Sequence, residues 1–186
     1  EDNMKDHYLP LCKSLNINPK EFFKSRIKYI KKASSGILLS KEMIKNISKE
    51  LKIDYNTLLK NWIKYKRKSI KKNHSLIRFI KKLIKQNYIV GSLSNVTDLH
   101  YKLCLEKKLY NVFQFNIQSF KIKMSKPDKK IYKFLLKKLK LPANEVLFID
   151  DHPDCIKTAK KLKINTIQFK NNKQLFRDLN KYNLKV

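Results

Sequence analysis

The sequence predicts an α/β protein built on a mainly parallel β-sheet and preceded by a segment made only of helices. Up to residue 73 the apolar residues recur at helical spacing, whereas from residue 74 helical patterns alternate with short apolar runs. Strands separated by helices join into parallel sheets through right-handed crossovers. The 186-residue chain has only two Gly and five Pro, which argues against a loop-rich all-β fold.

The N-terminal segment consists of helical patterns separated by polar breaks. Met4 begins the first pattern, and Pro19 stands where the first turn of the second helix is expected. Ser40 and Asp54 are the expected caps of the third and fourth helices. The apolar stripes of these helices are expected to be packing faces. The expected helices cover residues 4–15, 19–30, 40–51 and 54–63.

From residue 74 the expected elements alternate between helix and strand. The clearest strand is the uninterrupted apolar run Val-Leu-Phe-Ile at 146–149, which predicts burial on both faces. The run at 88–93 is also expected to be a buried strand. The expected helices lie at 76–84, 99–107, 129–139 and 154–162, and the expected strands at 88–93, 112–117, 146–149 and 164–169.

The formal net charge of +29 makes nucleic acid a candidate partner. The excess is nearly all lysine, with arginine only at Arg26, Arg67, Arg78 and Arg177, although base-reading surfaces favour the planar arginine fork. The lysines are also spread along the whole chain, which together with abundant Asn and Ile indicates the bias of an AT-rich genome. Compositional drift and a selected polyanion-binding role both remain open.

The cysteines indicate a reducing compartment. Cys12, Cys104 and Cys155 are odd in number, far apart and in no metal-binding spacing, which argues against a disulfide framework and fits the cytoplasm. No apolar stretch reaches the ~18–20 residues needed to cross a bilayer. We therefore expect a cytoplasmic protein without a membrane partner.

Polar residues of different chemistry close the expected strands or precede a helix. Ser94 and Asn95 end one strand and offer a hydroxyl and an amide to a phosphoryl oxygen. Lys126 supplies a cation just before a helix. Asp150 and Asp151 end another strand and can hold a hard cation such as Mg²⁺.

Each of these features alone also has an ordinary structural explanation. A Ser-Asn pair is commonly a turn, a Lys-Pro-Asp commonly starts a helix, and paired carboxylates are commonly solvated loop residues. Their shared position at the C-terminal side of one parallel sheet, where open α/β sheets bind ligands, favours a functional site.

Three ordered motifs resemble those of the haloacid dehalogenase superfamily, in the branch with a helical cap between its first two motifs. The segment Gly91-Ser-Leu-Ser-Asn-Val resembles the second motif, and Lys126-Pro-Asp-Lys-Lys-Ile-Tyr resembles the third. Val146-Leu-Phe-Ile-Asp-Asp-His-Pro-Asp-Cys resembles the fourth. The resemblance implies a three-layer Rossmann-like core at 74–186 and a helical cap at 1–73.

The resemblance also implies a Mg²⁺-dependent phosphatase that forms an aspartyl-phosphate. Ser94 would hydrogen-bond the transferring phosphoryl group, with Asn95 nearby, and Lys126 would neutralise charge on the nucleophile and the phosphate. Asp150 and Asp151 would complete the Mg²⁺ site. The implied substrate is a small phosphorylated metabolite of unspecified identity, and the sequence makes no prediction of oligomeric state.

The first motif of that superfamily, an Asp-x-Asp after the first strand, does not occur in this sequence. By resemblance, the missing strand is the central one of the sheet. Removing it would leave buried backbone groups without hydrogen-bond partners, and each such group costs roughly 1–3 kcal/mol of stability. We therefore expect a piece of a longer protein, inactive by itself, with a natural degenerate form as the alternative. The competing functional hypothesis is a non-catalytic module that binds RNA or another polyanion.

Overall fold

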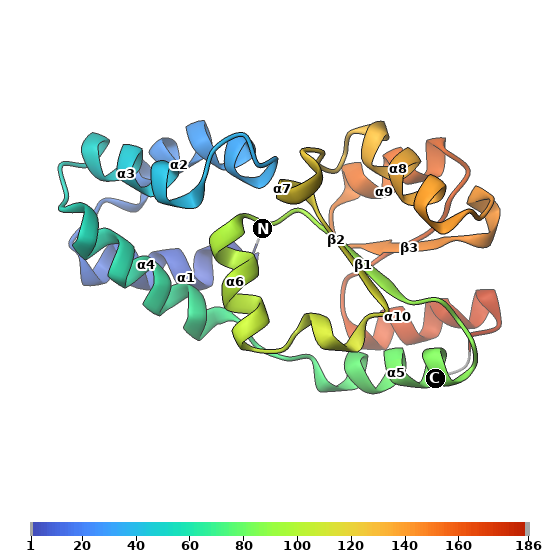
Figure 1. Ribbon diagram of the computed structural model, residues 1–186. Helices are drawn as coiled ribbons and strands as arrows, with labels where there is room; N and C mark the ends of the chain where they lie inside the picture. The colour runs from blue at the N-terminus through green and yellow to red at the C-terminus, as the bar shows by residue number, and fades with distance from the viewer. Residues whose placement is uncertain (1, 185–186) are drawn as a thin grey trace. The chain divides into compact units, whose positions relative to one another are not determined.

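The computed structural model describes residues 2–184, with side chains from Tyr8 onward. The chain folds as two compact units. The first runs to Asn73 and also includes Ile89–Lys123, and the second combines His74–Tyr88 with the chain from Met124 onward. Each unit contains helices and a pair of parallel strands (Figure 1), which confirms the predicted α/β class.

Four helices open the first unit: α1 (Asp2–Ser14), α2 (Pro19–Ser34), α3 (Ser40–Glu50) and α4 (Tyr55–Ser69). Two of the predicted helix starts are confirmed by their capping bonds. The Asn18 side chain accepts a hydrogen bond from the Lys20 amide at 2.9 Å, and the Asp54 carboxylate accepts from the Thr57 amide at 2.8 Å. These side chains satisfy amides that the first helical turn leaves without an intrahelical acceptor.

The expected cap at Ser40 is wrong, because Ser40 is the first residue of α3 and its side chain is used elsewhere. Its hydroxyl and its amide both donate to the carboxylate of Asp98, the amide at 2.9 Å. Asp98 begins α6 (Asp98–Glu106), so this carboxylate joins the N-terminus of α3 to that of α6. At the start of α3, the Leu39 amide donates a hydrogen bond to the Glu42 side chain.

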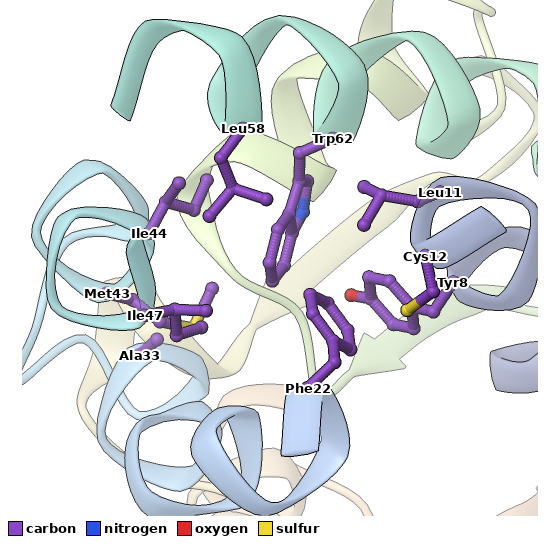
Figure 2. Close-up of a cluster of buried hydrophobic side chains, with 10 residues drawn as sticks. All are labelled: Tyr8, Leu11, Cys12, Phe22, Ala33, Met43, Ile44, Ile47, Leu58 and Trp62. Atoms are coloured by element: carbon purple, nitrogen blue, oxygen red, sulfur yellow. The ribbon is translucent and has the colours of Figure 1, made fainter. Parts of the chain in front are cut away.

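The four helices enclose a hydrophobic core (Figure 2). Three aromatic rings meet in it, with centroid distances of 5.1 Å between Tyr8 and Trp62, 5.3 Å between Tyr8 and Phe22, and 5.5 Å between Phe22 and Trp62. Tilted and edge-on aromatic pairs each add about 0.5–1.5 kcal/mol beyond the burial of their area. The buried core residues are Tyr8, Leu11, Cys12, Phe22, Ala33, Met43, Ile44, Ile47, Leu58 and Trp62.

The rest of the first unit is a parallel strand pair with its connections. These elements are β1 (Gly91–Ser94), α6, the 3-10 helix η1 (Tyr110–Val112), β2 (Phe115–Gln118) and α7 (Ser119–Ile122). Gly91 pairs with Phe115, and the Phe115 ring lies where a Cβ of residue 91 would stand, 2.1 Å from that position. Gly36 adopts a φ of +70°, and a Cβ there would lie 2.0 Å from the carbonyl oxygen of Phe120. Gly36 is therefore required by its positive φ and by the backbone of Phe120, whereas a side chain at residue 91 would have to displace the Phe115 ring.

The second unit contains α5 (His74–Lys85), α8 (Lys129–Leu139), the 3-10 helix η2 (Ala143–Glu145), β3 (Leu147–Asp150), α9 (Pro153–Lys161), β4 (Asn165–Gln168), α10 (Asn172–Leu179) and the 3-10 helix η3 (Asn180–Tyr182). β3 pairs in parallel with β4. The rings of Phe79 and Phe176 lie 5.5 Å apart and pack α5 against α10, and those of Tyr132 and Phe148 lie 5.4 Å apart and pack α8 against β3.

The prediction that strands 88–93 and 146–149 are fully buried is wrong. Tyr88 and Ile89 precede β1 and are 45% and 60% exposed, and Ile149 on β3 is 39% exposed. Among the described residues each strand is hydrogen-bonded to a neighbour on one side only, so it lacks the surroundings of a central strand. The absence of a central strand nevertheless stays a prediction. Helix α10 was not expected from the sequence.

The proposed division between a cap at 1–73 and a core at 74–186 also stays a prediction. The two compact units divide the chain differently, since β1 and β2 group with the N-terminal helices. Within the described part of the chain, no helix has the length and apolar character needed to cross a membrane.

Candidate functional site

A buried ion pair stands at the C-terminal end of β3. The Lys126 ammonium lies 2.6 Å from one carboxylate oxygen of Asp150, and the two side chains are only 10% and 7% exposed. The other carboxylate oxygen accepts a hydrogen bond from the His152 amide at 2.8 Å. Asp150 thus has both oxygens engaged at the point where β3 turns into α9. The structure brings Lys126 and Asp150 together, and their roles in a phosphoryl site stay a prediction.

Local structure on both sides of the pair fixes its geometry. Asp128 caps α8 by accepting from the Lys130 amide at 2.9 Å, which sets the direction of the chain just after Lys126. The Lys126 ammonium also lies 5.4 Å from the centre of the Phe148 ring. On the other side, the His152 ring accepts from the Asp154 amide at 3.3 Å and caps α9. His152 therefore serves the helix start.

Asp150 and Asp151 are the residues that could hold a metal ion. Carboxylate oxygens suit Mg²⁺, which commonly takes one or two protein carboxylates and completes its shell with water or phosphate oxygens. Asp151 is exposed, and its backbone carbonyl accepts a 3.2 Å hydrogen bond from the Gln168 side chain. Within the described side chains no cluster of three or more His, Cys, Asp or Glu forms a metal site. The pair thus fits Mg²⁺ as a partial ligand set.

Cys155, a buried thiol of the same unit as the pair, is unsuited to nucleophilic catalysis. Burial raises its pKa to about 11, and the neighbouring Asp150 carboxylate acts in the same direction. A thiol with so high a pKa is protonated at neutral pH, and the thiolate is the reactive form. The Tyr132 hydroxyl donates to the Cys155 carbonyl at 3.0 Å and ties α8 to α9 beneath the site.

Ser94 and Asn95, the other predicted site residues, belong to the first unit. Ser94 is the last residue of β1 and hydrogen-bonds the Tyr110 hydroxyl, which opposes the rise that burial causes in the pKa of Tyr110. Asn95 lines a cavity beside the N-terminal helices. Lys126 and Asp150 lie in the second unit, so the convergence of the two halves of the site stays a prediction.

Ser119 is a positioning residue that the sequence did not reveal. Its hydroxyl accepts from the Val96 amide at 3.0 Å and donates to the Ser34 carbonyl at 2.5 Å. The side chain is completely buried. It therefore ties the loop after Ser94 to the end of α2. In sequence it is only a serine after a strand, a pattern that carries no distinguishing signal.

Curated relatives match only a short part of this chain. The mouse (Mus musculus) bifunctional epoxide hydrolase 2 is 41% identical over 69 residues, which is 37% of this chain and 12% of that protein. The rat (Rattus norvegicus) protein is 39% identical over 69 residues, again 37% of this chain and 12% of that protein. The match thus spans about an eighth of each relative.

Solved structures share the fold over most of the chain. A HAD family enzyme from Bacteroides thetaiotaomicron superposes with a TM-score of 0.72 at 20% identity, covering 95% of this chain and 90% of that one. A predicted HAD-like family hydrolase from Porphyromonas gingivalis gives 0.70 at 18% identity, covering 89% and 90%. At these identities the likeness establishes the Rossmann-like fold.

The family itself is established by a sequence profile described as haloacid dehalogenase-like hydrolase, which matches residues 13–169. The matched range includes Ser94, Lys126 and Asp150 as well as the N-terminal helices from α2 onward. The chain belongs to the haloacid dehalogenase-like hydrolases.

Proposed function

We propose that this protein hydrolyses small phosphate monoesters with Mg²⁺ as cofactor. The observation that carries the proposal is the buried pair of Lys126 and Asp150 at the carboxyl end of a parallel strand. A cation and a carboxylate fixed there suit a phosphoryl group and its metal ion. In support, the Bacteroides thetaiotaomicron enzyme has been crystallised in complex with magnesium and inorganic phosphate.

Each residue takes a role that follows from its chemistry. Ser94 and Asn95 would hydrogen-bond the phosphoryl oxygens, and Lys126 would neutralise their charge. Asp150 and Asp151 would hold Mg²⁺, which when bound offsets the negative charge that develops on the phosphoryl oxygens. The Lys126 ammonium would hold the Asp150 carboxylate in a fixed orientation.

The nucleophile of this proposed reaction is an aspartate that the 186 residues do not supply in an Asp-x-Asp motif. Its carboxylate oxygen would attack phosphorus, the alcohol would leave with a proton from the second aspartate, and water would then hydrolyse the aspartyl-phosphate. We therefore propose that the 186-residue chain alone does not hydrolyse phosphate esters. The free, buried cysteines fit a cytoplasmic location for it.

The first test is to read the coding sequence upstream of Glu1 and to compare the 186-residue chain with any in-frame extension. Hydrolysis of a panel of phosphate monoesters is measured with and without Mg²⁺. We expect the extended protein to be active only with Mg²⁺, and the 186-residue chain to be inactive. Activity of the short chain would contradict the requirement for an added nucleophile.

Site variants then test the residue roles in the active protein. Lys126→Met is expected to lower kcat by about 10²–10³-fold, as the loss of one preorganised charge-stabilising group does. Lys129→Met removes the same charge from an exposed position nearby and should leave kcat unchanged. Equal effects of the two substitutions, or an extended protein without hydrolysis of any ester, would overturn the proposal. The polyanion-binding alternative would then be tested by the salt dependence of RNA binding.

A further inference from the structure

The loop that follows Ser94 is tied to the helices α2 and α3 at two points, both within the first unit. β1 ends at Ser94, and α6 begins at Asp98. The first point is Val96, whose amide donates to the Ser119 hydroxyl at 3.0 Å. That hydroxyl donates in turn to the Ser34 carbonyl at the end of α2. The backbone two residues beyond Ser94 is thus linked through one buried hydroxyl to the helical bundle.

The second point is the contact between Asp98 and Ser40, the first residue of α3. One carboxylate oxygen of Asp98 accepts from the Ser40 amide at 2.9 Å and also from the Ser40 hydroxyl. The Ser40 hydroxyl accepts in turn from the Leu99 amide at 3.4 Å. Hydrogen bonds to a carboxylate are roughly twice as strong as neutral ones, and Ser40 is buried. This contact is therefore the stronger of the two links.

Asp98 is not the cap of its own helix. Thr97 has that role, because its hydroxyl accepts from the His100 amide at 3.3 Å. The Asp98 carboxylate instead binds a residue 58 positions earlier in the chain. Such a contact adds nothing to the hydrogen bonds within α6, but it fixes where the start of α6 lies relative to α3.

The junction between α2 and α3, residues 35–39, lies between the two links. Ser34 stands before the junction and Ser40 after it, so each of its ends is held by one of these hydrogen-bonded contacts. In the middle, Gly36 packs so closely on α7 that a Cβ would lie 2.0 Å from the Phe120 carbonyl oxygen. The loop after Ser94 is therefore anchored to a segment that is itself held at three places.

We propose that Asp98 is a positioning residue: by binding Ser40 it holds the loop in the one conformation in which Ser94 and Asn95 can bind the phosphoryl group. Donors that stabilise a transition state must be in place before the reaction, and a misplacement of about 1 Å can cost about 10²-fold in rate. The effect on phosphoryl transfer rests on the proposed function, whereas the ordering of the loop does not.

The extended, active protein tests the catalytic effect. Asp98→Ala should lower kcat by at least about ten-fold and change KM by less than about three-fold, because Lys126 still binds the phosphoryl group. Asp98→Asn keeps an oxygen that can accept both bonds from Ser40, and it should restore most of kcat. Ser40→Ala removes only the hydroxyl and should have a smaller effect. The double variant Ser40→Ala/Asp98→Ala should be no slower than Asp98→Ala alone, because both changes remove one contact.

Glu106→Ala is the matched control. Glu106 is the last residue of α6 and forms an ion pair of 3.0 Å with Arg67 on α4, so it also joins α6 to the bundle, but at the end far from Ser94. Its removal should leave kcat unchanged. All rates are measured well below the lowest melting temperature of the variants, and circular dichroism checks folding. Equal losses of kcat in Asp98→Ala and Glu106→Ala would overturn the positioning role, and Ser40→Ala takes the place of Asp98→Ala if that variant does not fold.

The order of the loop is measured without catalysis, by backbone ¹⁵N relaxation of the 186-residue chain. We expect the order parameter of Asn95 to fall from about 0.85, as in rigid backbone, to below about 0.6 in Asp98→Ala. It should stay unchanged in Asp98→Asn and in Glu106→Ala. An unchanged order parameter, or an unchanged kcat in an active protein, overturns the role of Asp98 and leaves the phosphatase proposal standing. A loosened Asn95 in a protein that hydrolyses no ester would do the reverse.

Discussion

The helical bundle of the first unit and the β3–β4 layer of the second are held together differently. In the bundle, Leu11, Phe22 and Leu58 are completely buried around a group of packed aromatic rings. In the second unit Ile149, in the middle of the strand that carries Asp150, is 39% exposed. The bundle therefore depends on a closed apolar core, whereas the candidate site depends on a polar pair beside an incompletely covered strand.

The largest effect that tests this contrast is expected for Phe22→Ala. Truncating a completely buried Phe loses its transfer free energy and leaves a cavity, and such changes cost about 3–5 kcal/mol. Ile149→Ala should cost less than about 1 kcal/mol, because much of that side chain is already in water. Urea denaturation followed by circular dichroism measures both. A cost for Ile149→Ala close to that for Phe22→Ala would mean that further chain covers β3.

The next effect is expected at the ion pair. Lys126→Met leaves the Asp150 carboxylate buried without its cation, which should cost about 3 kcal/mol. Asp150→Asn alone should also destabilise the protein. The double variant should recover much of the loss, because neither charge is then left unpaired. A double-mutant cycle in urea measures the coupling, and additive costs would show that the pair is not an energetic unit.

The helices could be predicted because their signals are local. Helical spacing of apolar residues, the proline at position 19 and the cap at Asp54 depend only on nearby sequence, and the structure places helices there. Helix α10 was missed although its signal was present: Asn171 caps it, and Leu175 and Leu179 stand four residues apart on its buried face. The strands were located to within a few residues, but their burial depends on neighbours elsewhere in the chain, and it was overestimated.

The site was predictable only in part for the same reason. Lys126 and Asp150 could be paired because a recognisable motif surrounds each of them. Ser119 carries no motif. Only the packing of separate segments brings its hydroxyl to the Val96 amide and the Ser34 carbonyl.

The two glycines of this sequence stand where a side chain would meet another part of the chain, but the obstacles differ. At Gly36, which has a φ of +70°, a methyl group would overlap the backbone carbonyl of Phe120, and backbone cannot rotate away. At Gly91 a methyl group would overlap the tip of the Phe115 ring, which is part of a side chain. The loop at Gly36 is therefore the stricter of the two constraints on which residues this chain can carry.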